Sequence, residues 1–178
     1  LKTYDPHVWL GIPQAIHMVE RIRDSLKEID PSHAAGYDER AKNYVAKLEK
    51  LRADGKELLA GKKERKLLAF HDSLYYFTKS FDLVLADAIE SAPGAEPDPQ
   101  SIINLIKKCR EQGVRHIAIE PQYDANTSAK TILKALKEIN GEYVTVDTLE
   151  TAKSSDMDAG WYERKMRENL KNLAEKLQ

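Results

Sequence analysis

The sequence is poor in cysteine and has no long apolar run. Its one cysteine, Cys109, excludes an intramolecular disulfide and falls on the apolar face of a predicted helix, where we expect a small buried side chain. No apolar stretch approaches the ~18 residues that a membrane-spanning helix needs. Basic residues are not in excess, because 28 Lys and Arg stand against 29 Asp and Glu, a net charge of −1. That balance argues against a nucleic-acid-binding protein, which needs positive charge to engage phosphates.

Common catalytic and ligand-binding motifs are also absent. The chain has no phosphate-binding loop of the form GxxxxGKS or GxxxxGKT, no GxGxxG, no HExxH and no CxxC pair. No Ser or Cys stands in a recognisable nucleophile context. An initiating Met and a signal peptide are missing too, and the abrupt start at Leu1 suggests a processed or trimmed chain.

The composition is that of a globular domain, with 42% hydrophobic and 32% charged residues. Pro13 opens a first helical pattern, which Asp30 and Pro31 end. A second pattern runs from Pro31 to about Gly61, with Asp30 as its expected N-cap. About 28 residues at ~1.5 Å each make this helix roughly 40 Å long. It is either a solvated amphipathic or coiled-coil arm, or a rigid strut between two lobes.

After Gly61 the hydrophobic pattern changes to that of short strands. Apolar, mostly β-branched runs occupy residues 66–70, 83–89, 115–120 and 142–146. Helical segments separate them, at residues 72–80, 99–112 and 126–140. Strands that alternate with helices pair in parallel through right-handed crossovers. The sequence therefore predicts an α/β fold with a four-stranded parallel sheet flanked by helices, closed by a last helix from about Trp161.

Polar side chains follow each predicted strand, where an open parallel sheet binds its ligands. His71 follows the first strand, Glu90 the second, Glu120 ends the third and Asp147 follows the fourth. One imidazole and several carboxylates on one rim suit a divalent cation. A single histidine is more often a capping or core residue. The equivalent position of Asp147 shifts the balance toward metal binding by His71, but by spacing alone both interpretations stay open.

The other histidines carry less information by spacing alone. His7 follows Asp5 and Pro6 in an ordered turn without an evident role, and His17, His33 and His116 are not expected to be ligands. Glu120 is a candidate metal ligand, an outer acceptor that orients an imidazole, or an ordinary carboxylate at a strand end.

Five short motifs occur in a fixed order along the chain. They are Asp5-Pro6-His7-Val8-Trp9-Leu10, Phe70-His71-Asp72, the loop from Ser91 to Pro97, Ile119-Glu120-Pro121-Gln122, and Trp161-Tyr162 followed by Met166 to Leu170. Together they strongly resemble the zinc/manganese solute-binding proteins of bacterial ABC transporters, the cluster A-I or cluster 9 family. The resemblance covers essentially all 178 residues.

The resemblance implies two α/β lobes joined by a long helix, with the metal in the cleft between them. Residues 1–30 would be the end of the N-terminal lobe, most of which is absent, residues 31–61 the linking helix, and residues 62–178 the C-terminal lobe. His7 and His71 are then the imidazole ligands and Asp147 the carboxylate ligand. A further histidine of the family has no counterpart here, so a coordination position stays open.

The resemblance also implies a biological setting. Such a protein captures zinc outside the cytoplasm, in the periplasm or at the cell surface, and delivers it to a membrane permease. Some members have Glu where His71 stands, and these tend to bind manganese, so the imidazole favours zinc with manganese as the alternative. The sequence leaves lipid anchoring open. It also suggests that the fragment self-associates through its exposed lobe interface.

Two other functions compete with metal capture for transport. A metal-dependent hydrolase would use the open coordination position to activate water, but no separate general base is evident. A surface adhesion or interaction protein is the second alternative, since some relatives are described as adhesins and the long charged helix offers a contact surface. We expect a binding protein rather than an enzyme.

Overall fold

The computed structural model describes residues 4–91, 94–122 and 127–177. It confirms an α/β fold built on a four-stranded sheet. The strands are β1 (Lys66–His71), β2 (Val84–Glu90), β3 (His116–Ile119) and β4 (Glu142–Thr145), all parallel, in the order β2-β1-β3-β4. Each predicted strand is present within one or two residues of its expected bounds.

The helices alternate with the strands as the sequence predicts. They are α1 (Ile12–Ile29), α2 (Ala34–Ala60), α3 (Tyr75–Ser80), α4 (Pro99–Gln112), α5 (Thr127–Leu136) and α6 (Trp161–Lys176), with 3-10 turns η1 (Val8–Leu10), η2 (Pro31–His33), η3 (Lys137–Ile139) and η4 (Ser154–Asp156). Two expectations need correction. The helix expected at 72–80 begins only at Tyr75, and the side chain of Asp30 makes no capping bond to the backbone but bonds Ser32, His33 and Tyr37. Residues 92, 93 and 126 of the predicted loop and helix lie outside the described residues.

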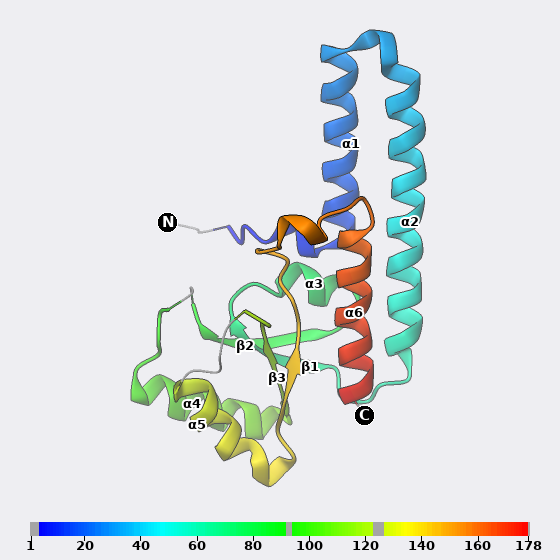
Figure 1. Ribbon diagram of the computed structural model, residues 1–178. Helices are drawn as coiled ribbons and strands as arrows, with labels where there is room; N and C mark the ends of the chain where they lie inside the picture. Colours follow the sequence, from blue (N-terminus) through cyan, green and yellow to red (C-terminus); the bar gives the residue numbers. More distant parts are fainter. Residues whose placement is uncertain (1–3, 92–93, 123–126, 178) are drawn as a thin grey trace.

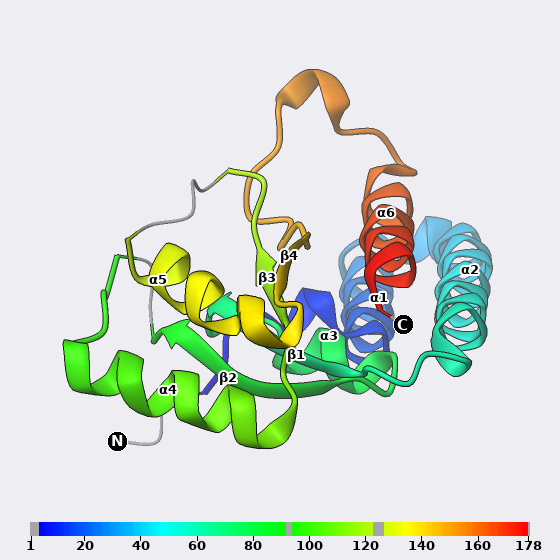
Figure 2. The same ribbon diagram turned by 90° about the horizontal axis from the view of Figure 1, so that it is seen from below.

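Helices cover both faces of the sheet. Figures 1 and 2 show α4 and α5 together on one face, and α1, α2 and α6 on the other side. Each face has its own apolar cluster, one built on Ile117, Ile132 and Leu136, the other on Leu67, Phe77 and Leu170. Residues 67–70 of the central strand β1 are a continuous apolar run buried on both faces, as is typical of parallel strands.

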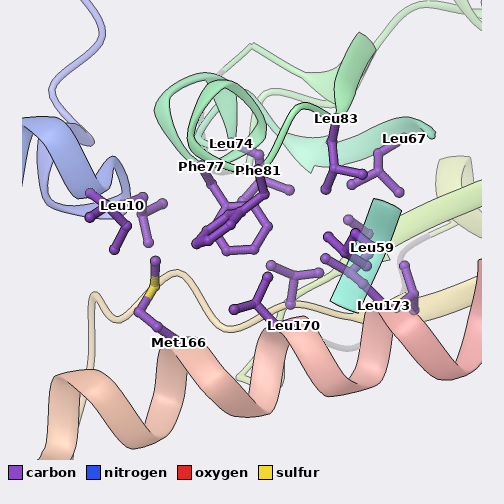
Figure 3. Close-up of a cluster of buried hydrophobic side chains, with 14 of the residues drawn as sticks. Leu10, Leu59, Leu67, Leu74, Phe77, Phe81, Leu83, Met166, Leu170 and Leu173 are labelled. Carbon is purple, nitrogen blue, oxygen red and sulfur yellow. The ribbon is translucent and has the colours of Figure 1, made fainter. Parts of the chain in front are cut away.

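The helices α1 and α2 form an antiparallel pair that extends well beyond the sheet, with the C-terminal helix α6 lying alongside α2 (Figure 1). The inner face of α6 is buried through Met166, Leu170 and Leu173 (Figure 3). The division into an N-terminal lobe remnant, a linking helix and a C-terminal lobe stays a prediction.

Gly55 lies where α2 comes closest to the body of the protein. A Cβ atom added there would lie 2.6 Å from Cε1 of Phe81 and 2.8 Å from Cδ1 of Leu170. We expect Gly55→Ala to lower the free energy of unfolding, because overpacking a core costs about 1–3 kcal/mol, more than the ~1 kcal/mol that Ala gains in a helix. Chemical denaturation measures the difference.

Gly36→Ala in the same helix is the matched control. Its added Cβ would approach only the far end of the Arg40 side chain, at 3.1 Å, so this variant should be as stable as the wild type or up to ~1 kcal/mol more stable. If Gly55→Ala behaved like Gly36→Ala, the close packing of α2 on Phe81 and Leu170 would be disproved.

Candidate metal centre

The strand order fixes where a site can form. Strands β1 and β3 are neighbours in the middle of the sheet. The connection after β1 leads to β2 on one side, and the connection after β3 leads to β4 on the other side, so the two connections run in opposite directions. Ligands of open α/β sheets bind at such a point, beyond the carboxyl ends of the strands. His71 is the last residue of β1, and Glu120 directly follows β3. These two side chains therefore meet in the crevice.

His71 is almost completely buried, with 2% of its side chain exposed. Its Nδ1 contacts Oε1 of Glu120, and its Nε2 lies 3.3 Å from Oε1 of Glu150. Neither ring nitrogen makes a well-aligned hydrogen bond to a described residue. Burial acts to lower the pKa of His71, but the two carboxylates outweigh it and the pKa lies above its ordinary value. A buried imidazole that faces carboxylates on both sides is suited to a cation.

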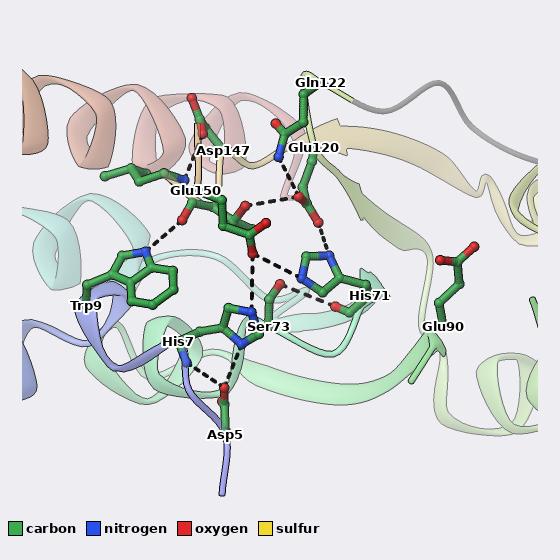
Figure 4. Close-up of polar contacts among 12 residues, drawn as sticks. Asp5, His7, Trp9, His71, Ser73, Glu90, Glu120, Gln122, Asp147 and Glu150 are labelled. Carbon is green, nitrogen blue, oxygen red and sulfur yellow. Dashed lines mark hydrogen bonds and ion pairs between the residues drawn. The ribbon is translucent and has the colours of Figure 1, made fainter. Parts of the chain in front are cut away.

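Glu120 is held rigidly behind His71. It is buried, and its Oε2 accepts hydrogen bonds from Nε2 of Gln122 at 2.8 Å and Oγ1 of Thr148 at 3.0 Å. Its other oxygen, Oε1, contacts His71 (Figure 4). A carboxylate on Nδ1 keeps the proton on that nitrogen and leaves Nε2 free to bind a metal.

His7 approaches the same place from the N-terminal segment. Its Nδ1 lies 2.7 Å from Oδ1 of Asp5, which also accepts the backbone N–H of His7 at 2.9 Å. The ring centres of His7 and His71 are 5.3 Å apart. The segment is fastened to the body through Trp9, whose indole Nε1 donates to the carbonyl of Thr148 at 2.8 Å and whose carbonyl accepts from Tyr162. Each imidazole thus has a carboxylate on its Nδ1 side.

Glu150 completes the group. Its Oε1 lies 3.2 Å from Nε2 of His7 and 3.3 Å from Nε2 of His71, and Figure 4 shows it between the two rings. One ligand atom from each of these three residues lies within 4.8 Å of the others. Within the described part of the chain, no other group of three such residues comes this close. The Glu150 side chain is 23% exposed, so an ion can reach the site from solvent.

Asp147, the carboxylate ligand expected from the sequence, lies outside this group. Its Oδ1 accepts the backbone N–H of Leu149 at 2.9 Å, and its Oδ2 lies 3.4 Å from Nζ of Lys165. Leu149 has a positive φ of 58°, which most residues adopt only under constraint. The resulting tight turn brings Glu150 toward the imidazoles. The sequence analysis did not name Glu150, because the rule for strand ends and the family resemblance both pointed to Asp147, the first carboxylate after the strand.

The other three histidines, which were not expected to be ligands, and Glu90 lie elsewhere. His17 and His33 are exposed on the helical pair, each with 73% of its side chain accessible. His116 begins β3, at the opposite end of the sheet from the crevice, where burial lowers its pKa. Glu90 ends β2, but its carboxylate points away from the rings and accepts the N–H of Gly94 (Figure 4). The structure thus brings together His7 and His71, with Glu120 behind His71.

Two imidazoles and one carboxylate that converge at the carboxyl edge of a parallel sheet are typical of proteins that bind a divalent transition metal. Comparison with known proteins points the same way. Residues 2–176 match the family model ZnuA, described as zinc-uptake complex component A periplasmic. The chain belongs to this family.

Individual relatives share the fold and moderate sequence identity. The zinc-binding protein AdcA of Streptococcus pyogenes is 30% identical over 172 residues, which is 96% of this chain and 33% of AdcA. The solute-binding protein FpvC of Pseudomonas aeruginosa, solved with Mn²⁺, has a TM-score of 0.82 at 26% identity, over 98% of this chain and 63% of that one. The laminin-binding protein Lmb of Streptococcus agalactiae is described as bifunctional with adhesin and metal transporting activity. It has a TM-score of 0.82 at 25% identity, over 98% of this chain and 65% of that one.

The chain therefore spans about a third of AdcA and less than two thirds of these solved structures. None of the helices that the structure describes is long and apolar enough to cross a membrane.

Proposed function

We propose that this chain binds one divalent transition metal ion, zinc first, through Nε2 of His7, Nε2 of His71 and an oxygen of Glu150. The observation that carries the proposal is the convergence of these three atoms within 4.8 Å. The donor set fits zinc, which takes imidazole nitrogen and carboxylate oxygen in a compact four-coordinate site. A fourth position is open to water or to a further ligand.

Zinc is favoured over manganese by the ligand types. Imidazole is a softer donor than carboxylate, and two of the three proposed ligands are imidazoles. The zinc-binding name of AdcA agrees with this preference, whereas the Mn²⁺ complex of FpvC keeps manganese as the alternative. The metal is the cargo of the protein, so the site needs accessible ligands as well as affinity.

The biological role proposed is that of an extracytoplasmic solute-binding component, which captures the ion and passes it to an ABC transporter permease. Family membership supports this role. Metal capture also fits better than hydrolysis, because the relatives are binding and transport proteins. Self-association of the chain stays a prediction.

Adhesion is a second candidate function, favoured by the likeness to Lmb. The helical pair α1–α2 exposes apolar side chains, including Ile22 at 57% and Ile29 at 78% of their surface. Such residues suit a protein contact that does not involve the metal centre.

Isothermal titration of the chain with zinc tests the proposed function. We expect one ion bound per chain at neutral pH, with an affinity that falls as the pH decreases. Protons compete for the imidazoles, and because the pKa of His71 is raised, the loss should begin above the ordinary value of about 6.5. No binding at neutral pH, or equal affinity at about pH 8 and about pH 5.5, would contradict the proposal.

A further inference from the structure

Thr148 lies at the junction of the three segments that carry the proposed ligands. It is completely buried, with none of its surface exposed. Its hydroxyl Oγ1 donates to Oε2 of Glu120 at 3.0 Å, and its carbonyl accepts the indole N–H of Trp9 at 2.8 Å. Thr148 is thus hydrogen-bonded to Glu120 and to Trp9, which belong to segments distant from it in the sequence.

Each of these bonds leads to a proposed ligand. Glu120 contacts Nδ1 of His71 with the oxygen that Thr148 does not occupy. Trp9 is two residues from His7, and their rings meet edge to face with centres 5.4 Å apart. Glu150 is two residues beyond Thr148 in the same turn. A displacement of Thr148 would therefore move or loosen all three ligands.

The turn that holds Thr148 is itself fixed. Asn169 of α6 is buried, and its side-chain amide pairs with both backbone groups of Asp147, at 2.8 Å to the N–H and 2.7 Å to the carbonyl. Asp147 in turn holds the N–H of Leu149. Thr148 is clamped between these two anchored residues, so its hydroxyl has a fixed position from which to orient Glu120.

We propose that Thr148 is a positioning residue, which holds His7, His71 and Glu150 in a common geometry before the metal arrives. This inference rests on the proposed function. It assigns the hydroxyl a role in metal affinity, separate from the contribution that a buried side chain makes to packing. Outer residues that orient ligating imidazoles commonly affect metal affinity tenfold to a hundredfold.

Two substitutions separate the hydroxyl from the packing. Thr148→Val keeps the volume and branching of the side chain but removes the hydroxyl, whereas Thr148→Ser keeps the hydroxyl and removes the methyl group. We expect zinc affinity to fall about tenfold in Thr148→Val and to stay within about twofold of the wild type in Thr148→Ser. Thr145→Val, at an exposed position of β4, is the matched control and should bind as the wild type does.

If Thr148→Ser bound zinc more weakly than Thr148→Val, packing of the methyl group and not the hydroxyl would determine the affinity, and the proposal would be overturned. Wild-type affinity in Thr148→Val would also overturn it. Failure of the wild type to bind zinc would instead refute the proposed function. The ¹⁵N NMR shifts of the His71 ring in the metal-free chain then still test Thr148. These shifts should change in Thr148→Val and not in Thr148→Ser. Unchanged shifts in both variants would show that the Thr148 hydroxyl does not position His71 through Glu120.

Discussion

Zinc affinity is expected to fall more than about a hundredfold when His71 is replaced by Ala. His71 supplies one of three proposed ligand atoms, and it is the most buried of the three, with 2% of its side chain exposed. Loss of a ligand should exceed the tenfold to hundredfold cost of changing an outer partner. The substitution also leaves Oε1 of Glu120 without the imidazole that it contacts, so some loss of stability is expected as well. Zinc titration in competition with a chelator measures the affinity.

Two controls distinguish loss of the ligand from loss of the fold. His17→Ala removes an exposed histidine on α1 and should leave the affinity unchanged. Circular dichroism and chemical denaturation show whether His71→Ala is folded at the temperature of the titration. A folded His71→Ala chain that binds zinc as tightly as the wild type would exclude His71 as a ligand. Adhesion through another surface should survive the same substitution.

Much of the fold is predictable from the sequence because its elements follow simple patterns. Residues 67–70 of β1 form an apolar run that is buried on both faces, as is typical of a central parallel strand. The helix α4 has the predicted bounds, residues 99–112, and the Asp98 carboxylate caps it by accepting the N–H groups of Gln100 and Ser101. The helix predicted from residue 72 begins later, because Asp72 and Ser73 form a turn before α3 starts at Tyr75.

The site is less predictable because it depends on contacts between distant segments. His71 can be identified from the sequence as a candidate ligand, because it follows a predicted strand at the edge where a parallel sheet binds its ligands. His7 has no such local signal, and only the resemblance to a family assigned it a role. Its place beside His71 depends on the bond from Trp9 to Thr148, which spans 139 positions in the sequence. No local periodicity contains that information.

The choice between Asp147 and Glu150 as the proposed carboxylate ligand depends on more than topology. The rule that ligands follow strand ends points to Asp147, the first carboxylate after β4. In the structure, that carboxylate stabilises a turn by binding the N–H of Leu149, and the left-handed backbone of Leu149 brings the next residue to the crevice. The local chemistry is foreseeable in principle, since Asp commonly bonds a backbone N–H two residues on. Its consequence for Glu150 is visible only in three dimensions.

Glu150 and Asp147 can be compared by one matched pair of substitutions, each from carboxylate to amide. Glu150→Gln removes the negative charge between the two imidazoles and should lower zinc affinity by roughly tenfold to a hundredfold or more. Asp147→Asn keeps a side-chain oxygen that can accept the N–H of Leu149, so the turn is preserved. It loses only a partly exposed ion pair with Lys165, and the affinity should stay within about threefold of the wild type.

Zinc titration of these two variants beside the wild type is the most direct test of the proposed metal centre. The structure predicts one zinc ion bound by the wild type and by Asp147→Asn with similar affinity, and much weaker binding by Glu150→Gln. The reverse order, with binding lost in Asp147→Asn and retained in Glu150→Gln, would contradict the assignment of Glu150 as the third ligand beside His7 and His71.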